Sequence, residues 1–166
     1  MRSKILFTAV SAAFLLSASA YAAGTGKSCL ASECRAGSKA VTYATKAEPY
    51  YACPTRELAT YSNFVLGLLA MHVSLGGGMP NISDKTGEPE YLDVGGKPNE
   101  TRLILTSLRQ KAGVTTFDQA VARCAQGRNG TRVVVMNNPQ DETVIWVVDE
   151  SKKAAFWMPK AHLDSR

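Results

Sequence analysis

The side chains that most often carry out chemistry are few in this chain of 166 residues. It has only two histidines, His72 and His162, and they do not form the His-x-x-x-His pair of a zinc enzyme. His72 lies in an apolar run, which favours a histidine satisfied by its neighbours in a core. Neither a P-loop nor a dinucleotide-binding glycine pattern is present. We therefore expect no metal site, no cofactor and no catalytic residues.

The four cysteines are Cys29, Cys34, Cys53 and Cys124. A cysteine hydrolase would need a free thiolate beside a histidine, and zinc ligands would show paired short spacings that are missing here. An even number of cysteines in an exported chain is typical of disulfides. Of the possible pairings we favour Cys29–Cys34, which closes a tight loop, with Cys53–Cys124, which joins segments about 70 residues apart.

Three acidic residues gather in a glycine- and proline-rich stretch. Glu88, Glu90 and Asp93 flank Tyr91 and could supply the two opposed carboxylates of a glycosidase. An acidic, solvated loop is the simpler explanation.

Three arginines, Arg123, Arg128 and Arg132, follow one another around a short predicted helix and its turn. They could face an acidic partner or the anionic envelope, although a solvated helix end explains them more simply. The formal net charge is +5, and loss of Arg2 and Lys4 with the leader described next lowers it by two, to +3. This charge is too small to imply nucleic acid as a partner.

The first 22 residues have the order of a cleaved signal peptide. Arg2 and Lys4 form a positive start, an apolar stretch runs over 5–18, and Ala20-Tyr21-Ala22 has the form that signal peptidase reads. The apolar stretch is shorter than the roughly 20 residues that span a bilayer. We expect cleavage after Ala22, a periplasmic or secreted location, and no stable membrane anchor after cleavage.

The remaining chain predicts a flexible N-terminal lead over 23–37 and a single α+β domain over 38–166. Strand-like alternation begins at Lys39. A helical insertion covers about 54–125, and an antiparallel β-meander covers 131–166.

The first predicted helix begins at Pro54, because proline suits the first turn, where its missing N–H has no helical partner. Apolar residues then recur at helical spacing until Gly76-Gly77-Gly78 ends the helix. Residues 76–100 hold many glycines and prolines and form a long loop.

Two more helices are predicted in the insertion. One runs over about 99–112, where Asn99 or Thr101 can cap its first turn. The other begins at Thr116, which forms a capping box with Gln119.

The C-terminal part predicts three strands, over 131–138, 143–149 and 154–158. A short 3₁₀ turn over 159–163 follows, because a proline cannot continue a central strand.

This tail resembles the end of bacterial SH3-like domains. The matching features are the strand with Trp146, the tight turn Glu150–Lys153 and the strand with Phe156-Trp157, while Ala40–Tyr43 would be the opening strand. A glycine commonly follows that turn in the family, whereas Ala154-Ala155 stands here. The resemblance implies a small SH3-like β-barrel with an inserted helical segment. A plain antiparallel meander within an α+β domain is the alternative.

The resemblance also implies a shallow binding groove. Carried over by position, its residues are Tyr43, Trp146, Pro159 and His162, and the histidine would make the groove more polar and sensitive to pH. Strand alternation also places Trp146 on the face of Val144, so Trp146 could instead belong to the core.

Together these features predict an exported, non-enzymatic binding or accessory protein that contacts another envelope protein or a peptide. An inhibitor or immunity-type protein against a hydrolase and a cell-wall-acting enzyme are the alternatives.

Overall fold

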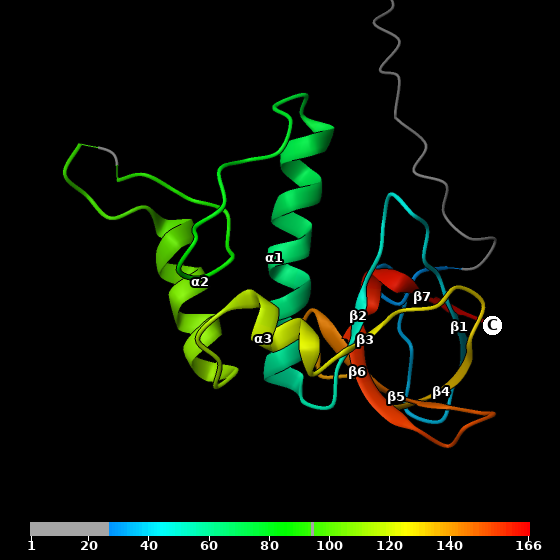
Figure 1. The fold of residues 1–166 in the computed structure, drawn as a ribbon. Helices are drawn as coiled ribbons and strands as arrows, with labels where there is room; N and C mark the ends of the chain where they lie inside the picture. Colours follow the sequence, from blue (N-terminus) through cyan, green and yellow to red (C-terminus); the bar gives the residue numbers. More distant parts are fainter. Residues whose placement is uncertain (1–26, 94) are drawn as a thin grey trace, which may run out of the picture.

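The computed structural model describes residues 27–93 and 95–166, which form three helices and seven strands of an α+β fold (Figure 1). The predicted signal peptide, 1–22, lies outside these residues. The elements are β1 (Lys39–Thr42), β2 (Tyr51–Ala52), α1 (Arg56–Ser74), α2 (Glu100–Lys111), α3 (Phe117–Ala122), β3 (Ala125–Gln126), β4 (Arg132–Asn137), β5 (Val144–Asp149), β6 (Ala155–Pro159), η1 (Lys160–His162, a 3₁₀ helix) and β7 (Leu163–Ser165). The α+β class predicted from the sequence is confirmed.

The main sheet has five antiparallel strands in the order β6-β5-β4-β1-β7. The three predicted C-terminal strands form the meander β4-β5-β6, and β1 joins its far side. A separate pair, β2 and β3, lies beside the β6 edge. Within the described residues the sheet does not close into a barrel, and the SH3-like resemblance stays a prediction.

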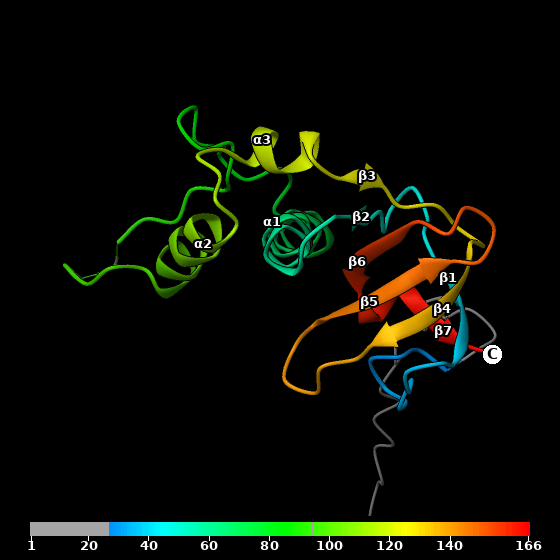
Figure 2. The ribbon, with the colours of Figure 1, turned by 90° about the horizontal axis from the view of Figure 1, so that it is seen from below.

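Both faces of this sheet carry a hydrophobic core, because side chains alternate along each strand. On β5, Ile145 and Val147 point into a core enclosed by the curved sheet and the segment before β1. Val144 points the other way, into a core shared with the helices. Helix α1 lies between the sheet and α2, while α3 lies along the side of α1 and leads directly into β3 (Figure 2).

Each of the three helices begins at a residue whose side-chain oxygen accepts a backbone N–H, as capping requires. These residues are Thr55, Asn99 and Thr116. The predicted start of α1 is therefore corrected by two residues, from Pro54 to Arg56, because Pro54 lies before the cap. At α3 the capping box is incomplete, since Gln119 accepts from Thr115 instead. Among the described residues, no helix combines the length and apolar character that would let it cross a membrane.

The long loop after α1 is fastened to the helices by buried polar contacts. Tyr61 of α1 donates a hydrogen bond of 2.7 Å to Glu88, and Arg109 of α2 forms an ion pair with the same carboxylate. His72 and Tyr91 make a second contact, with 3.2 Å between Nε2 and Oη. Burial, followed by the contact with Glu88, raises the pKa of Tyr61.

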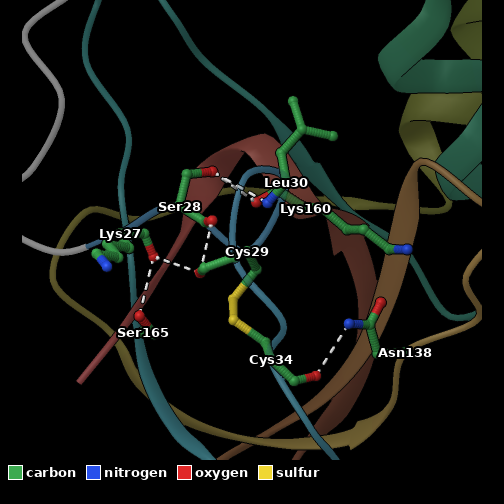
Figure 3. The surroundings of a disulfide bond; sticks show 9 residues. Lys27, Ser28, Cys29, Leu30, Cys34, Asn138, Lys160 and Ser165 are labelled. Carbon is green, nitrogen blue, oxygen red and sulfur yellow. Dashed lines mark hydrogen bonds between the residues drawn. A yellow bond between two sulfur atoms is a disulfide. The ribbon is translucent and has the colours of Figure 1, made fainter.

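The segment predicted as a flexible lead, 23–37, is packed against the sheet in its described part (Figure 3). The disulfide Cys29–Cys34 lies in the core that the sheet encloses. The Cys29 N–H donates to the carbonyl of Leu163 over 2.7 Å, and Asn138 donates to the carbonyl of Cys34 over 2.9 Å. Glycine and serine content suggested a loose segment, but the two buried half-cystines and these hydrogen bonds hold it to the domain.

Candidate functional site: a groove of small residues with a basic rim

A groove of about 380 Å³ opens where β2 and β3 meet the β6 edge of the main sheet. Five alanine and glycine residues are part of its lining, and we call it the small-residue groove. They are Ala52, Ala125, Gly127, Ala154 and Ala155. The rings of Tyr50 and Phe156 also line it, so most of its surface is apolar.

A short bridge and a disulfide hold the walls of the groove together. Cys53 and Trp157 exchange two backbone hydrogen bonds, of 2.9 and 2.8 Å, which attach the end of β2 to β6. The Cys53–Cys124 disulfide then ties the residue before β3 to the same point. Asn63 of α1 pairs with both backbone groups of Tyr51, at 2.8 and 2.9 Å, and so fixes the other end of β2.

One glycine is required by the shape of the groove. The Gly127 N–H donates to the carbonyl of Tyr50 over 2.7 Å, and a Cβ atom on Gly127 would lie 2.3 Å from the Tyr50 ring. Only glycine therefore lets β3 approach this ring. The Tyr50 hydroxyl donates to the carbonyl of Arg128 over 3.3 Å, and burial raises the pKa of this tyrosine.

The rim of the groove is basic. Arg123 precedes β3, Arg128 follows it, and Lys152 stands opposite in the turn between β5 and β6. All three side chains are exposed, and none forms a salt bridge within the part of the chain that the structure describes. The groove can therefore take an apolar group with negative charge beside it.

The carboxylate in this lining, Asp149, is occupied by its own turn. One of its oxygens accepts from the Ser151 N–H at 2.7 Å, from the Ser151 hydroxyl at 2.6 Å and from the Lys152 N–H at 3.1 Å. These hydrogen bonds, that of the Ser151 hydroxyl first, lower the pKa of Asp149. Asp149 thus shapes the turn that presents Lys152.

Several of the residues that could have served enzyme chemistry have structural partners. All four cysteines form the two favoured disulfides, Cys29–Cys34 and Cys53–Cys124. Glu88 lies in the buried ion pair described above, and Asp93 pairs with Arg102 of α2. Among the described residues there is no cluster of potential metal ligands.

Two of the four groove residues implied by the SH3-like resemblance are neighbours. The Tyr43 N–H donates to the carbonyl of His162 over 2.8 Å, and His162 Nδ1 lies 3.0 Å from the carbonyl oxygen of Tyr43. The His162 ring lies against Tyr50, with 5.1 Å between ring centroids. His162 thus lies next to the small-residue groove through its contact with the Tyr50 ring, but neither Tyr43 nor His162 lines the groove.

The other two residues lie toward the helices. Trp146 of β5 stacks on Trp157 of β6, with 6.2 Å between ring centroids. Pro159 ends β6, opposite Val144, and precedes the 3₁₀ helix. The contacts therefore divide the four implied residues into two groups, with Trp146 on the helix-side face of the sheet.

We expect Trp146→Ala to lower the free energy of unfolding by less than about 2 kcal/mol, because the Trp146 residue is 36% exposed and loses mainly a stacking contact. The matched variant Trp157→Ala empties part of the helix-side core and is expected to cost about 3–5 kcal/mol. Urea unfolding of the two variants measures both losses. Equal losses would place Trp146 in the core.

Sequence reasoning missed the small-residue groove because its walls come from very short elements. Strand β3 has only two residues, both exposed, which is too few for an alternating pattern to be detected in the sequence. The signals that did exist were Cys124, the glycine after β3, and the alanine pair that replaced the glycine expected after the turn. Arg123, Arg128 and Arg132 suggest an acidic partner or the anionic envelope, but a solvated helix end is the simpler interpretation of the sequence.

Comparison of this chain with models of protein families, with curated proteins and with solved structures found no match.

Proposed function

We propose that this protein is an exported, non-enzymatic binding or accessory protein whose small-residue groove holds a segment of an envelope protein or a peptide. The observation that carries the proposal is the groove itself. It combines about 380 Å³ of mostly apolar space with a rim of basic side chains that have no salt-bridge partner among the described residues. Ligand sites of proteins typically have this mixture of apolar lining and a few polar groups.

The two disulfides fit a protein of an oxidising compartment, such as the periplasm or the extracellular space. The predicted signal peptide supports the same location. The SH3-like resemblance, which we retain as part of this proposal, agrees with a domain that binds peptides. An inhibitor or immunity-type protein would be a special case, and inhibition of a captured hydrolase would distinguish it.

The groove is tested by filling it. We expect Ala155→Trp to reduce capture of an envelope partner by at least about tenfold, because an indole would occupy the space of the ligand. Ala161→Trp is the matched control, since Ala161 is exposed on η1 and does not line the groove. Immobilised oxidised protein and its two variants are incubated with envelope extract, and retained proteins are identified and quantified.

Both variants should melt within a few degrees of the unchanged protein, because both alanines are exposed. A partner retained equally by the unchanged protein and by both variants would show that binding does not use the groove. Absence of any specifically retained partner would remove the proposal.

A further inference from the structure

We infer that the segment held by the groove is an acidic peptide: an extended chain with small apolar side chains in the groove and carboxylates next to it. This inference rests on the proposed binding function and adds the charge and shape of the partner. It follows from the charge balance around the groove, from a second hollow beside it, and from an open strand edge in its wall.

The charge balance around the groove is positive, with four cations and two carboxylates in the linings of the groove and its neighbouring hollow. Arg123, Arg128, Arg132 and Lys152 are exposed, and within the described residues none forms a salt bridge. Two carboxylates offset part of this charge: Asp149, which accepts three hydrogen bonds from its own turn, and Glu150, which pairs with Lys39 at 3.8 Å. A partner with carboxylates would complement these four cations.

A second hollow continues the groove and is more polar. It has a volume of about 470 Å³, and Arg132 and Glu150 are among its lining residues. Arg128, Thr131, Asp149 and Lys152 line both hollows. One ligand can therefore run from the apolar groove, past Arg128 and Lys152, into the polar hollow, and its apolar and acidic parts would be neighbours in sequence.

The wall formed by β6 offers backbone groups to such a chain. The Asp149 N–H donates to the carbonyl of Ala154 over 2.9 Å, so every second residue after Ala154 also points its backbone groups toward β5. Ala155 and Trp157 point theirs out of the sheet edge. Trp157 uses both groups in its bridge with Cys53.

No strand of this chain pairs with the outward edge of β6 at Ala155 among the described residues. Antiparallel pairing would bring Thr55 opposite Ala155, but Thr55 instead caps α1, where its carbonyl accepts from the Ala59 N–H over 3.1 Å. The outward N–H and carbonyl of Ala155 thus lie in the lining of the groove, where an extended peptide can pair with them. Strand addition of this kind favours a polypeptide as the ligand.

A nucleic acid fits these observations less well. Single-stranded nucleic acid is usually held by exposed aromatic rings on which bases stack, along a basic track. Here the two aromatic rings that line the groove are not exposed, because Tyr50 is buried and Phe156 is half-buried. The four cations also gather around one groove and its neighbour rather than along a stripe.

The test uses fluorescence anisotropy of the oxidised protein with two labelled synthetic peptides. One is a run of alanines followed by a run of glutamates, and the other has glutamines in place of the glutamates. We expect the glutamate peptide to bind at least about tenfold more tightly at low salt, and the difference to shrink as salt is added. Equal dissociation constants would overturn the inference.

Charge reversal locates the effect. Arg128→Glu/Lys152→Glu is expected to weaken binding of the glutamate peptide by at least about tenfold. The matched control, Lys46→Glu/Lys85→Glu, makes the same change in net charge at exposed lysines outside both hollows and should change it less than about threefold. Equal weakening by both double variants would contradict a localised site.

Two further outcomes separate the inference from the function on which it rests. If Ala155→Trp releases an envelope partner but Arg128→Glu/Lys152→Glu does not, the groove binds a partner that is not acidic, and only the inference fails. If Ala155→Trp releases neither partner nor peptide, the proposed function fails. A labelled single-stranded oligonucleotide that binds more tightly than the peptide, and is lost in the same double variant, would assign the cations to nucleic acid.

Discussion

Replacing Cys53 and Cys124 together with alanine is expected to lower the free energy of unfolding by about 4 kcal/mol, because the disulfide closes a long loop in the unfolded chain. The two cysteines are 71 positions apart, and Cys53 is completely buried in the helix-side core. The loss should be larger than for the other disulfide. Urea unfolding followed by tryptophan fluorescence measures it.

The control is Cys29→Ala/Cys34→Ala. That bridge spans only 5 positions, so its loss should cost about 2 kcal/mol on the same loop-entropy argument. Each double variant removes two half-cystines from a hydrophobic core, so the change in side-chain volume is the same in both. Equal losses of unfolding free energy in the two double variants would show that the length of the closed loop does not determine the contribution of each disulfide.

The two bridges should also differ in function. Only Cys53–Cys124 connects the end of β2 to the residue before β3, so its removal frees the wall of the groove that carries Arg123 and Gly127. Under conditions where both double variants remain folded, we expect only the one without this bridge to lose the glutamate peptide. The groove thus depends on a covalent link between residues that are distant in sequence.

Much of the fold could be predicted because the signals were local. Thr116 caps α3 as predicted, Asn99 is the one of the two predicted candidates that caps α2, and Gly113 follows α2 with a positive φ of 64°. The strands β4, β5 and β6 fall within one or two residues of their predicted bounds. Alternation and capping are written into neighbouring residues, so one sequence suffices to detect them.

The groove could not be predicted, because it depends on contacts between distant segments. Gly127 is required only because the Tyr50 ring lies beneath it, and Ala155 is open only because Thr55, which would lie opposite it, caps α1. Neither fact has a local signature. The groove residues implied by the SH3-like resemblance were carried over by position, and the contacts in the structure separate Trp146 from Tyr43.

The long loop over 76–100 is a similar case. Its composition predicted a loop, which is confirmed, but gave no sign that Glu88 would lie buried between Tyr61 and Arg109. A carboxylate inside a glycine-rich acidic stretch usually stays solvated. Here its side chain is 7% exposed and that of Arg109 18% exposed. Removal of water from both partners makes this pair sensitive to the loss of either one.

Arg109→Met is therefore expected to cost about 3–5 kcal/mol, because the buried Glu88 carboxylate loses the cation that compensates it. The double variant Glu88→Gln/Arg109→Met removes the charge as well, and the amide oxygen introduced at this position can still accept the hydrogen bond from Tyr61. We expect the double variant to be more stable than Arg109→Met by at least about 1 kcal/mol. Chemical denaturation of the unchanged protein and the two variants gives these differences.

A second ion pair on α2 provides the control. Arg102 and Asp93 approach to 2.7 Å, but their side chains are 49% and 43% exposed. Arg102→Met makes the same substitution on the same helix, and because water already screens this pair, the expected cost is below about 1 kcal/mol. Since both pairs fasten the same loop to α2, the comparison isolates burial as the cause. Similar costs for Arg102→Met and Arg109→Met would mean that burial of the Glu88–Arg109 pair does not determine the loss of stability.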